Sequence, residues 1–337
     1  MSAPTRLRPW HLAAGSVLLL GSVLLSVLLG AAELGGQRVL AEIVAQLTGG
    51  VSPLSEREAA ILWELRVPRT VLGVLVGAAL AVSGAAFQGV FRNPLADPYL
   101  LGSAAGAGLA VTLVITAAPD TGLSIPVQAA AFAGALGGVG LTWLVGRSAG
   151  RDTATLVLAG VAVGAFLTAG QTFLQQLRVD SLQQVYLWIL GRLSTTGWHE
   201  VLIVLPQLAI SAVVLCLCAR LLDVLGTGDE EAASLGVHPG RVRALVLIAA
   251  SLATAAAVSV AGLIGFVGLV VPHLVRLALG GGSRIVVPMS LLVGGVFLVF
   301  ADMLARTLLA PAEIPIGVIT AFTGAPFFAV LLHRRRA

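Results

Sequence analysis

The chain has 337 residues, of which 58% are hydrophobic and only 11% are charged, and its mean hydropathy is +0.99. Soluble domains carry about a quarter of charged residues, so this composition excludes an ordinary soluble protein and predicts one embedded in a bilayer. The formal net charge is +4 and all 20 basic residues are arginine. A chain without lysine cannot form a P-loop, which excludes ATP hydrolysis by that motif, and arginines scattered between apolar runs do not indicate nucleic-acid binding.

Ten apolar runs follow one another along the chain, separated by short polar or proline-marked breaks. A helix needs about 20 apolar residues to cross a bilayer. The sequence therefore predicts an all-α, polytopic membrane protein with one transmembrane domain over residues 1–337. The predicted spans are 12–31, 68–89, 98–117, 124–146, 154–176, 199–220, 243–262, 264–280, 285–306 and 315–333. The first is expected to be a retained span, because no clear signal-peptide cleavage site precedes Glu33.

The arginines give these spans an orientation. With ten spans both termini lie on one side, and most arginines fall on that same side. The positive-inside rule then predicts cytoplasmic termini in a multi-pass protein of the cell membrane. In this topology 32–67 is an external segment and 221–242 is the longest cytoplasmic loop.

Small residues within the spans indicate close helix packing. Four pairs have the GxxxG spacing, and packing inside one subunit is favoured over dimerisation for most of them: Gly73 and Gly77, Gly102 and Gly106, Gly134 and Gly138, Gly160 and Gly164. Glycine at every third position from Gly262 to Gly268 predicts a broken helical segment. The run 66–95 also resembles the run 241–274, which would begin on the other side. An inverted repeat and chance similarity both explain this likeness.

Only one charged residue, Asp302, lies clearly within a predicted span, and Arg306 is placed four residues later to form a structural ion pair with it. The predicted spans show no midplane carboxylates of the kind that ion-coupled carriers use. An ion-coupled secondary transporter is therefore the second interpretation. A membrane-embedded enzyme is the third, because no cluster of catalytic residue types is visible. The histidines lie on separate segments, so no metal site or other cofactor of the protein is expected.

Several motifs occur in a fixed order from residue 60 onward, namely Arg66-Val67-Pro68-Arg69, residues 91–98 (FRNPLADP), 265–273 (GFVGLVVPH), 311–317 (PAEIPIG) and 324–327 (GAPF). Together they resemble motifs of the FecCD family, the permeases of ABC importers for ferric siderophores, haem and cobalamin. The resemblance implies a permease without its own ATPase that translocates a metal chelate inward. It further implies a homodimer, two cytoplasmic ATPase subunits and an external substrate-binding protein.

The resemblance also assigns roles to residues. Arg66, Arg69 and Arg306 match arginines that dock the binding protein through its acidic residues, a task suited to bidentate guanidinium groups. For Arg306 the alternative is its pair with Asp302, and any interfacial arginine can instead hold lipid headgroups. Asn93, Leu95 and Thr153 resemble cytoplasmic constrictions of the pathway, with simple turn formation as an equally weighted alternative.

The cytoplasmic loop 221–242 resembles the family's coupling loop, which contacts the ATPase. Its acidic start predicts a short helix, Gly236 a C-cap and Pro239 the start of another helical turn. Two helix signals in so few residues favour a coupling element over a plain solvated connector. The residues expected to couple are Asp229, Glu230, Leu235, Gly236, Val237 and Arg241.

Overall fold

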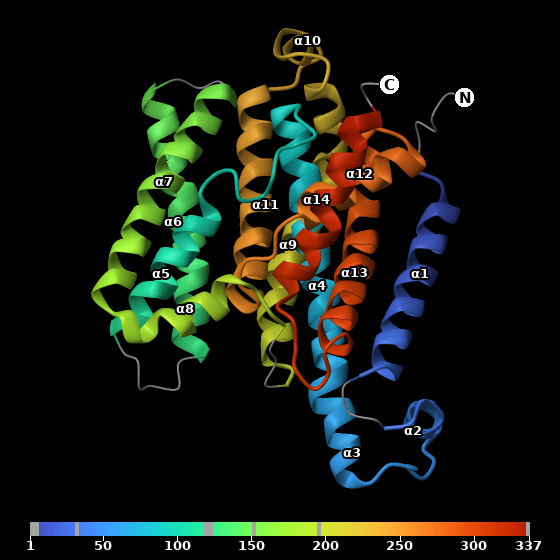
Figure 1. Ribbon diagram of the computed structural model, residues 1–337. Helices are drawn as coiled ribbons and strands as arrows, with labels where there is room; N and C mark the ends of the chain where they lie inside the picture. The colour runs from blue at the N-terminus through green and yellow to red at the C-terminus, as the bar shows by residue number, and fades with distance from the viewer. Residues whose placement is uncertain (1–6, 31–33, 118–123, 150–152, 194–196, 335–337) are drawn as a thin grey trace.

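The computed structural model describes residues 7–30, 34–117, 124–149, 153–193 and 197–334. The described residues form an all-helical bundle without β-strands (Figure 1). Part of the expected external segment, residues 32 and 33, lies outside the described ranges.

Each of the ten predicted runs overlaps one helix. These helices are α1 (Pro9–Leu28), α4 (Val67–Phe91), α5 (Ser103–Ala117), α6 (Ser124–Ala149), α7 (Thr153–Leu177), α9 (His199–Leu225), α11 (Pro239–Ala261), α12 (Val267–Leu279), α13 (Ser283–Thr307) and α14 (Ile316–Arg334). Seven of the helices are long and apolar enough to cross a membrane, whereas α5, α12 and α14 are shorter. The polytopic membrane fold is thus confirmed.

Two predicted spans begin several residues later in the structure than the sequence placed them. The run expected to begin at residue 98 begins as α5 at Ser103, after a non-helical segment that contains Pro94 and Pro98. Proline favours extended or turn backbone before it, which explains the delayed start. The run expected from residue 264 begins as α12 at Val267, because Gly262 and Phe266 both adopt positive φ angles, of 69° and 68°. The broken segment that the glycine spacing predicts is confirmed as residues 262–266.

Smaller elements extend the two ends of the bundle. At one end lie α2 (Gly36–Thr48), α3 (Glu56–Ala60) and the π-helical η1 (Ile61–Arg66), which runs directly into α4. The opposite end carries α10 (Asp229–Ser234), the start of α1 and the end of α14 (Figure 1). The 3-10 turn η2 (Val179–Ser181) and α8 (Leu182–Ile189) follow α7. The loops predicted to be external and cytoplasmic therefore lie at opposite ends.

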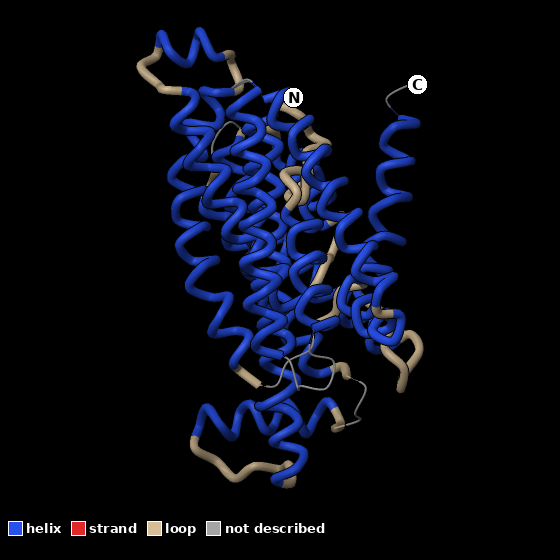
Figure 2. The backbone as a smooth tube through the Cα atoms, turned by 90° about the vertical axis from the view of Figure 1, so that its left-hand side faces the viewer, coloured by secondary structure: helices blue, strands red, loops and turns tan. Residues whose placement is uncertain are grey.

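The centre of the bundle is α4, which is buried along most of its length and packs against α1, α9, α11, α12 and α13. A second group of helices, α5, α6 and α7, stands beside this central group (Figures 1 and 2). The two groups meet mainly where α11 contacts α6. Alanine and valine dominate the buried face of α11, which suits its close approach to both groups.

Backbones touch directly where glycines face one another. A Cβ atom added to Gly84 would lie 1.9 Å from the carbonyl oxygen of Gly268, and one added to Gly77 would lie 2.2 Å from that of Gly294. Gly106 and Gly134 meet in the same way between α5 and α6. These contacts confirm that most of the GxxxG glycines pack helices within the subunit. Gly164 is an exception, with no such neighbour within 4 Å.

Candidate functional site

Two helices of the bundle break in matching ways. The helix α4 runs toward the α10 end and is followed by the non-helical segment 92–102 and then α5. The helix α11 runs in the opposite direction and is followed by 262–266 and then α12 (Figure 1). The same order of elements in opposite directions agrees with the inverted repeat that the sequence left open.

Tyr99 joins the two broken segments. Its hydroxyl donates to the carbonyl oxygen of Ile264 over 3.0 Å and accepts from the backbone N–H of the same residue over 3.2 Å. Backbone groups released from helical pairing need partners in a membrane protein. Tyr99 supplies one for each of these two groups, so the two breaks support each other.

A second link holds α12 against α4. The side-chain amide of Gln88 donates to the carbonyl oxygen of Gly268 over 3.0 Å, and Arg276 donates to the amide oxygen of Gln88. Gly268 has no room for a side chain, because a Cβ atom there would lie 2.6 Å from the Pro98 ring. The start of α12 is therefore fixed against both α4 and the non-helical segment 92–102 that follows α4.

Asp97 adds a carboxylate that the sequence did not place inside the bundle. Its Oδ1 accepts from the backbone N–H of Tyr99 over 2.8 Å. Because Tyr99 also bonds to Ile264, Asp97 lies where the two broken segments meet. Asp97 lies in the non-helical segment 92–102. The prediction that Asp302 is the one acid clearly within a span is therefore unchanged.

Apolar clefts flank the broken segments. One, of about 550 Å³, lies between α5 and α7 and is lined by Tyr99, Gly160 and Thr168 among others. The other, of about 580 Å³, is lined by residues of α8 and α14 and by Phe266. Both reach Leu263 and Ile189. A bulky molecule that crosses the bundle would find mostly apolar walls here.

The residues predicted to form gates lie at turns and helix starts. Arg92 ends α4 with φ 50°. Directly after it, the Oδ1 atom of Asn93 accepts a hydrogen bond of 2.9 Å from the backbone N–H of Leu95. Leu95 is 56% exposed, and Thr153 is the first residue of α7. The turn role of Asn93 is therefore visible, and its gating role stays a prediction.

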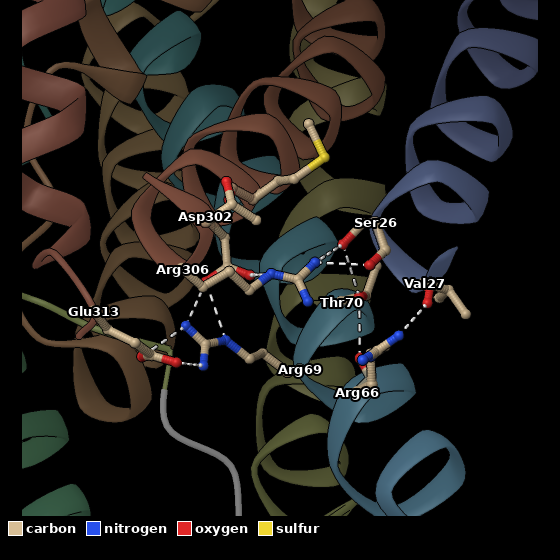
Figure 3. A network of polar contacts seen from close by, with 10 residues as sticks. Ser26, Val27, Arg66, Arg69, Thr70, Asp302, Arg306 and Glu313 are labelled. Carbon is tan, nitrogen blue, oxygen red and sulfur yellow. Dashed lines mark hydrogen bonds and ion pairs between the residues drawn. The ribbon is translucent and has the colours of Figure 1, made fainter. Parts of the chain in front are cut away.

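A network of charged groups ties four segments together at the end that carries α2 and α3 (Figure 3). Asp302 of α13 lies 3.3 Å from Arg306, as the sequence predicted, and 2.8 Å from Arg69 of α4. Arg69 also makes a bidentate contact with Glu313, at 2.7 and 3.1 Å. The carboxylate of Asp302 is thus shared by two guanidinium groups, and Glu313 extends the network into the loop before α14.

The other arginines of this network contact α1. Arg306 donates to the carbonyl oxygen of Ser26 over 2.7 Å, and Arg66 donates to that of Val27 over 3.0 Å. Both side chains are buried, whereas the side chain of Arg69 is 18% exposed. Among the three arginines predicted to dock a binding protein, Arg69 has its guanidinium next to an exposed group, Glu313. Docking stays a prediction for all three.

The coupling loop is organised around α10 and a glycine turn. Gly236 has φ 79°, its N–H bonds to the oxygen of Ala233 over 2.9 Å, and the N–H of Val237 bonds to that of Ala232 over 3.0 Å. This pair of bonds is a Schellman motif. It confirms Gly236 as the cap of α10, and α11 begins at Pro239 as predicted.

Asp229 connects this loop to two other elements. Its Oδ1 accepts from Arg92 at the end of α4 and from Arg243 of α11. The hydrogen bond from Arg243 is the main cause that lowers the pKa of Asp229, with Arg92 adding to it. Glu230, Leu235, Gly236 and Arg241 are exposed, and Val237 is half-buried. The predicted coupling residues therefore surround a turn whose acidic end is attached to α4.

Sequence reasoning missed Tyr99, Gln88, Arg92 and Arg243. Arg92 and Tyr99 lie within or beside the FRNPLADP motif, which was the available signal. Gln88 and Arg276 are polar residues within apolar runs, a pattern that also points to function.

Comparisons with known proteins agree on one family. Residues 18–334 match the FecCD transport family. The chain is 46% identical over 281 residues to the cobalamin import system permease protein BtuC of Halobacterium salinarum, covering 83% of this chain and 75% of that one. It is 40% identical over 280 residues to the hemin transport system permease protein HmuU of Yersinia pestis, covering 82% and 84%. A solved structure described as a metal-chelate type ABC transporter in an inward-facing conformation aligns with a TM-score of 0.84 at 27% identity, covering 97% and 100%.

Proposed function

Because this chain belongs to the FecCD transport family, we propose that it is the membrane-spanning permease of an ATP-driven importer and carries a metal chelate inward. The chelate class is a ferric siderophore, cobalamin or haem. Its relatives named for cobalamin and hemin import support this class. In this proposal the metal belongs to the cargo and the chain has no catalytic role.

The assembly follows from the same premise. Two copies of the chain form the pathway, two cytoplasmic ATPase subunits bind at the α10 end, and an external substrate-binding protein docks at the α2 end. The chain lies in the cell membrane with ten spans and both termini cytoplasmic. This arrangement is supported by the start of α1 and the end of α14, which lie at the same end of the bundle as α10 (Figure 1).

The observation that carries the transport role is the contact of Tyr99 with Ile264 between two apolar clefts. Broken helices at the interface of two repeats are the usual place of substrate passage in transporters. The hydrogen bond holds the two broken segments together, while the clefts give a bulky chelate mostly apolar walls. Movement of one repeat against the other would change the width of both clefts.

Coupling to ATP hydrolysis is proposed to pass through Asp229. The ATPase binds around Leu235, Gly236 and Arg241, and its closure moves α10. Because Asp229 contacts Arg92, that movement reaches the turn that holds Asn93 and Leu95. Asn93, Leu95 and Thr153 then act as the cytoplasmic gate.

The gate is tested by thiol labelling of single cysteines at Asn93, Leu95 and Thr153 after Cys216 and Cys218 are replaced by alanine. Small thiol reagents should react in some nucleotide states of the assembled importer and not in others. Equal labelling with and without ATP would show that these residues are plain turns.

Docking is proposed to centre on Arg69, with Arg66 and Arg306 fixing the helices around it. An acidic group of the binding protein would compete with Glu313 for the Arg69 guanidinium. Arg66→Glu combined with Arg69→Glu should greatly weaken association of the binding protein. Basic substitutions on that protein should restore it, whereas unchanged association at moderate salt would contradict the proposal.

The whole function is tested by reconstituting the chain with its ATPase and binding protein in liposomes. ATP-dependent accumulation of a ferric siderophore, cobalamin or haem is expected, and the chelate retained by the purified binding protein identifies the substrate. Uptake that follows a proton or sodium gradient without ATP would contradict the proposal.

A further inference from the structure

The helix α2 has an apolar face that nothing in the described chain covers. Leu40, Val44 and Leu47 follow one another at helical spacing and are 42%, 57% and 82% exposed, and Val51, just after the helix, is 95% exposed. Water-exposed apolar stripes of this kind mark a binding surface. From its position and chemistry we infer that this face of α2 lies in the membrane interface and binds lipid.

The opposite face of α2 is firmly attached, so the exposed stripe has a fixed direction. Val39 is buried in a cluster that includes Leu62 of η1 and Val27 of α1. Glu42 is also buried and accepts from the indole N–H of Trp63 over 3.0 Å and from Ser52. The helix therefore cannot turn its apolar stripe toward the protein without losing these contacts.

The axis of α2 lies across the bundle. Figure 1 views the helix nearly end-on and Figure 2 views it from the side, running perpendicular to the long helices. A helix in this direction lies parallel to the membrane plane. Amphipathic helices in the interface take this orientation and bury their apolar face about 5–10 Å into the boundary between headgroups and acyl chains.

The depth of α2 also fits the interface. Trp63, which bonds to Glu42, precedes Arg66 by less than one helical turn, and Arg66 contacts Val27 in the last turn of α1. The helix α2 thus lies just beyond the level where α1 ends, on the same edge of the molecule (Figure 1). The helix α1 itself carries exposed apolar residues, among them Leu25 near its end, and Leu29 just after the helix is exposed as well. The stripe continues a surface that must already face lipid.

The lack of free charge on this face of α2 favours lipid over a polar protein as its partner. The stripe itself contains no charged residue. Arg38 is paired with Glu58 at 2.7 Å, and Glu42 is buried. Burial of apolar area is then the main contribution that the stripe can make to binding. This inference requires only that the chain spans a membrane, and it goes beyond the proposed import function.

Spin labels on the two sides of α2 test the inference. In a variant with Cys216 and Cys218 replaced by alanine, a nitroxide is attached at Leu47→Cys or, as the matched control on the exposed polar side, at Ala41→Cys. The purified permease is placed in liposomes, and collision rates are measured with oxygen, which concentrates in lipid, and with a neutral nickel chelate, which stays in water. The ratio of oxygen to nickel collisions should be at least several-fold higher at Leu47 than at Ala41.

Two results would overturn the inference. Equal ratios at Leu47 and Ala41 would place the stripe in water, and exclusion of both reagents from Leu47 would show that protein covers it. If Leu47→Cys fails to fold, Val44→Cys carries the same expectation. The measurement uses neither ATPase nor substrate, so its outcome is independent of whether the chain imports a chelate.

Discussion

The two ends of the molecule hold similar groups of charged residues in different surroundings. At the α2 end, Asp302 is buried and shared between Arg69 and Arg306, which fixes α4 to α13 (Figure 3). At the α10 end, Asp229 is exposed and is likewise shared between two arginines, Arg92 and Arg243. Each end has one carboxylate shared by two guanidinium groups, but the carboxylate is buried at one end and exposed at the other.

This difference separates a fixed end from a movable one. Breaking a buried pair leaves an uncompensated charge, which costs about 3–5 kcal/mol, whereas exposed pairs are worth about 0–1 kcal/mol and are screened by salt. The network at Asp302 therefore resists rearrangement. The contact at Asp229 costs little to release and remake, as the proposed coupling to an ATPase requires.

The largest expected effect is at Asp302. Asp302→Ala should lower the free energy of unfolding by about 3–5 kcal/mol, because the buried Arg306 would lose its carboxylate partner and Arg69 would keep only Glu313. The matched control is Glu313→Gln, which removes the exposed partner of Arg69 and should cost less than about 1 kcal/mol. Unfolding titrations in mixed micelles measure both. Equal losses of stability in the two variants would show that the buried carboxylate contributes no more than an exposed one, which would contradict the description of this end as fixed.

A smaller effect is expected at Gly236. A valine there must adopt a left-handed backbone, which costs about 1–2 kcal/mol and would distort the turn rather than the bundle. Gly236→Val should leave the permease folded and able to bind the external protein, while association with the ATPase or its stimulation is lost together with uptake.

The control for this variant is Gly240→Ala, which adds a side chain in α11 where no atom lies within 4 Å of the new Cβ. Reconstituted complexes decide the question. If Gly236→Val vesicles import substrate and couple hydrolysis like the parent, the loop 221–242 is not the coupling element.

The smallest effect on stability is expected at Asp229. Asp229→Asn should change the free energy of unfolding by less than about 1 kcal/mol, yet reduce the hydrolysis that the loaded binding protein stimulates. High salt should also reduce this stimulated hydrolysis in the complex without the substitution, because salt screens the exposed ion pairs of Asp229. Glu231→Gln, an exposed position on the same helix outside the predicted coupling residues, is the control. A normal ATPase response in Asp229→Asn would show that α10 moves the gate without this contact.

The pH dependence of this contact follows from the lowered pKa of Asp229. A carboxylate whose pKa is lowered by folding contributes stability above its unfolded value, near 3.9, and loses that contribution as pH falls through the folded value. The contact should therefore be fully formed across the neutral range.

Local rules predicted much of this molecule. Hydropathy located the apolar helices of the bundle, seven of them long enough to cross a membrane and three shorter. Helical spacing predicted the pair of Asp302 with Arg306. Gly236 was predicted as a cap because the residue after a helix often has a left-handed backbone, which glycine adopts most readily. Each of these inferences needs only neighbours along the chain.

Contacts between distant segments could not be predicted in the same way. Arg69 and Asp302 are 233 residues apart, and Tyr99 and Ile264 are 165 apart. Their meeting depends on how α4, α11 and α13 pack, which no local spacing encodes. The helix α2 was missed for a different reason. Its apolar residues do repeat at helical spacing from Val39 to Leu47, but the segment was read only as an external loop.

The backbone contacts at Gly77 and Gly84 have a consequence for how this protein tolerates mutation. In a soluble core, removal of side-chain volume is usually the damaging change, because it leaves a cavity. Here the closest helices meet through carbonyl oxygens and glycine Cα atoms, so there is no side-chain volume to remove. Addition of a single methyl group at Gly84 would force α4 and α12 apart. Random substitution should therefore be most harmful where the residue is smallest, and the positions that bear the least side chain should vary least among working sequences.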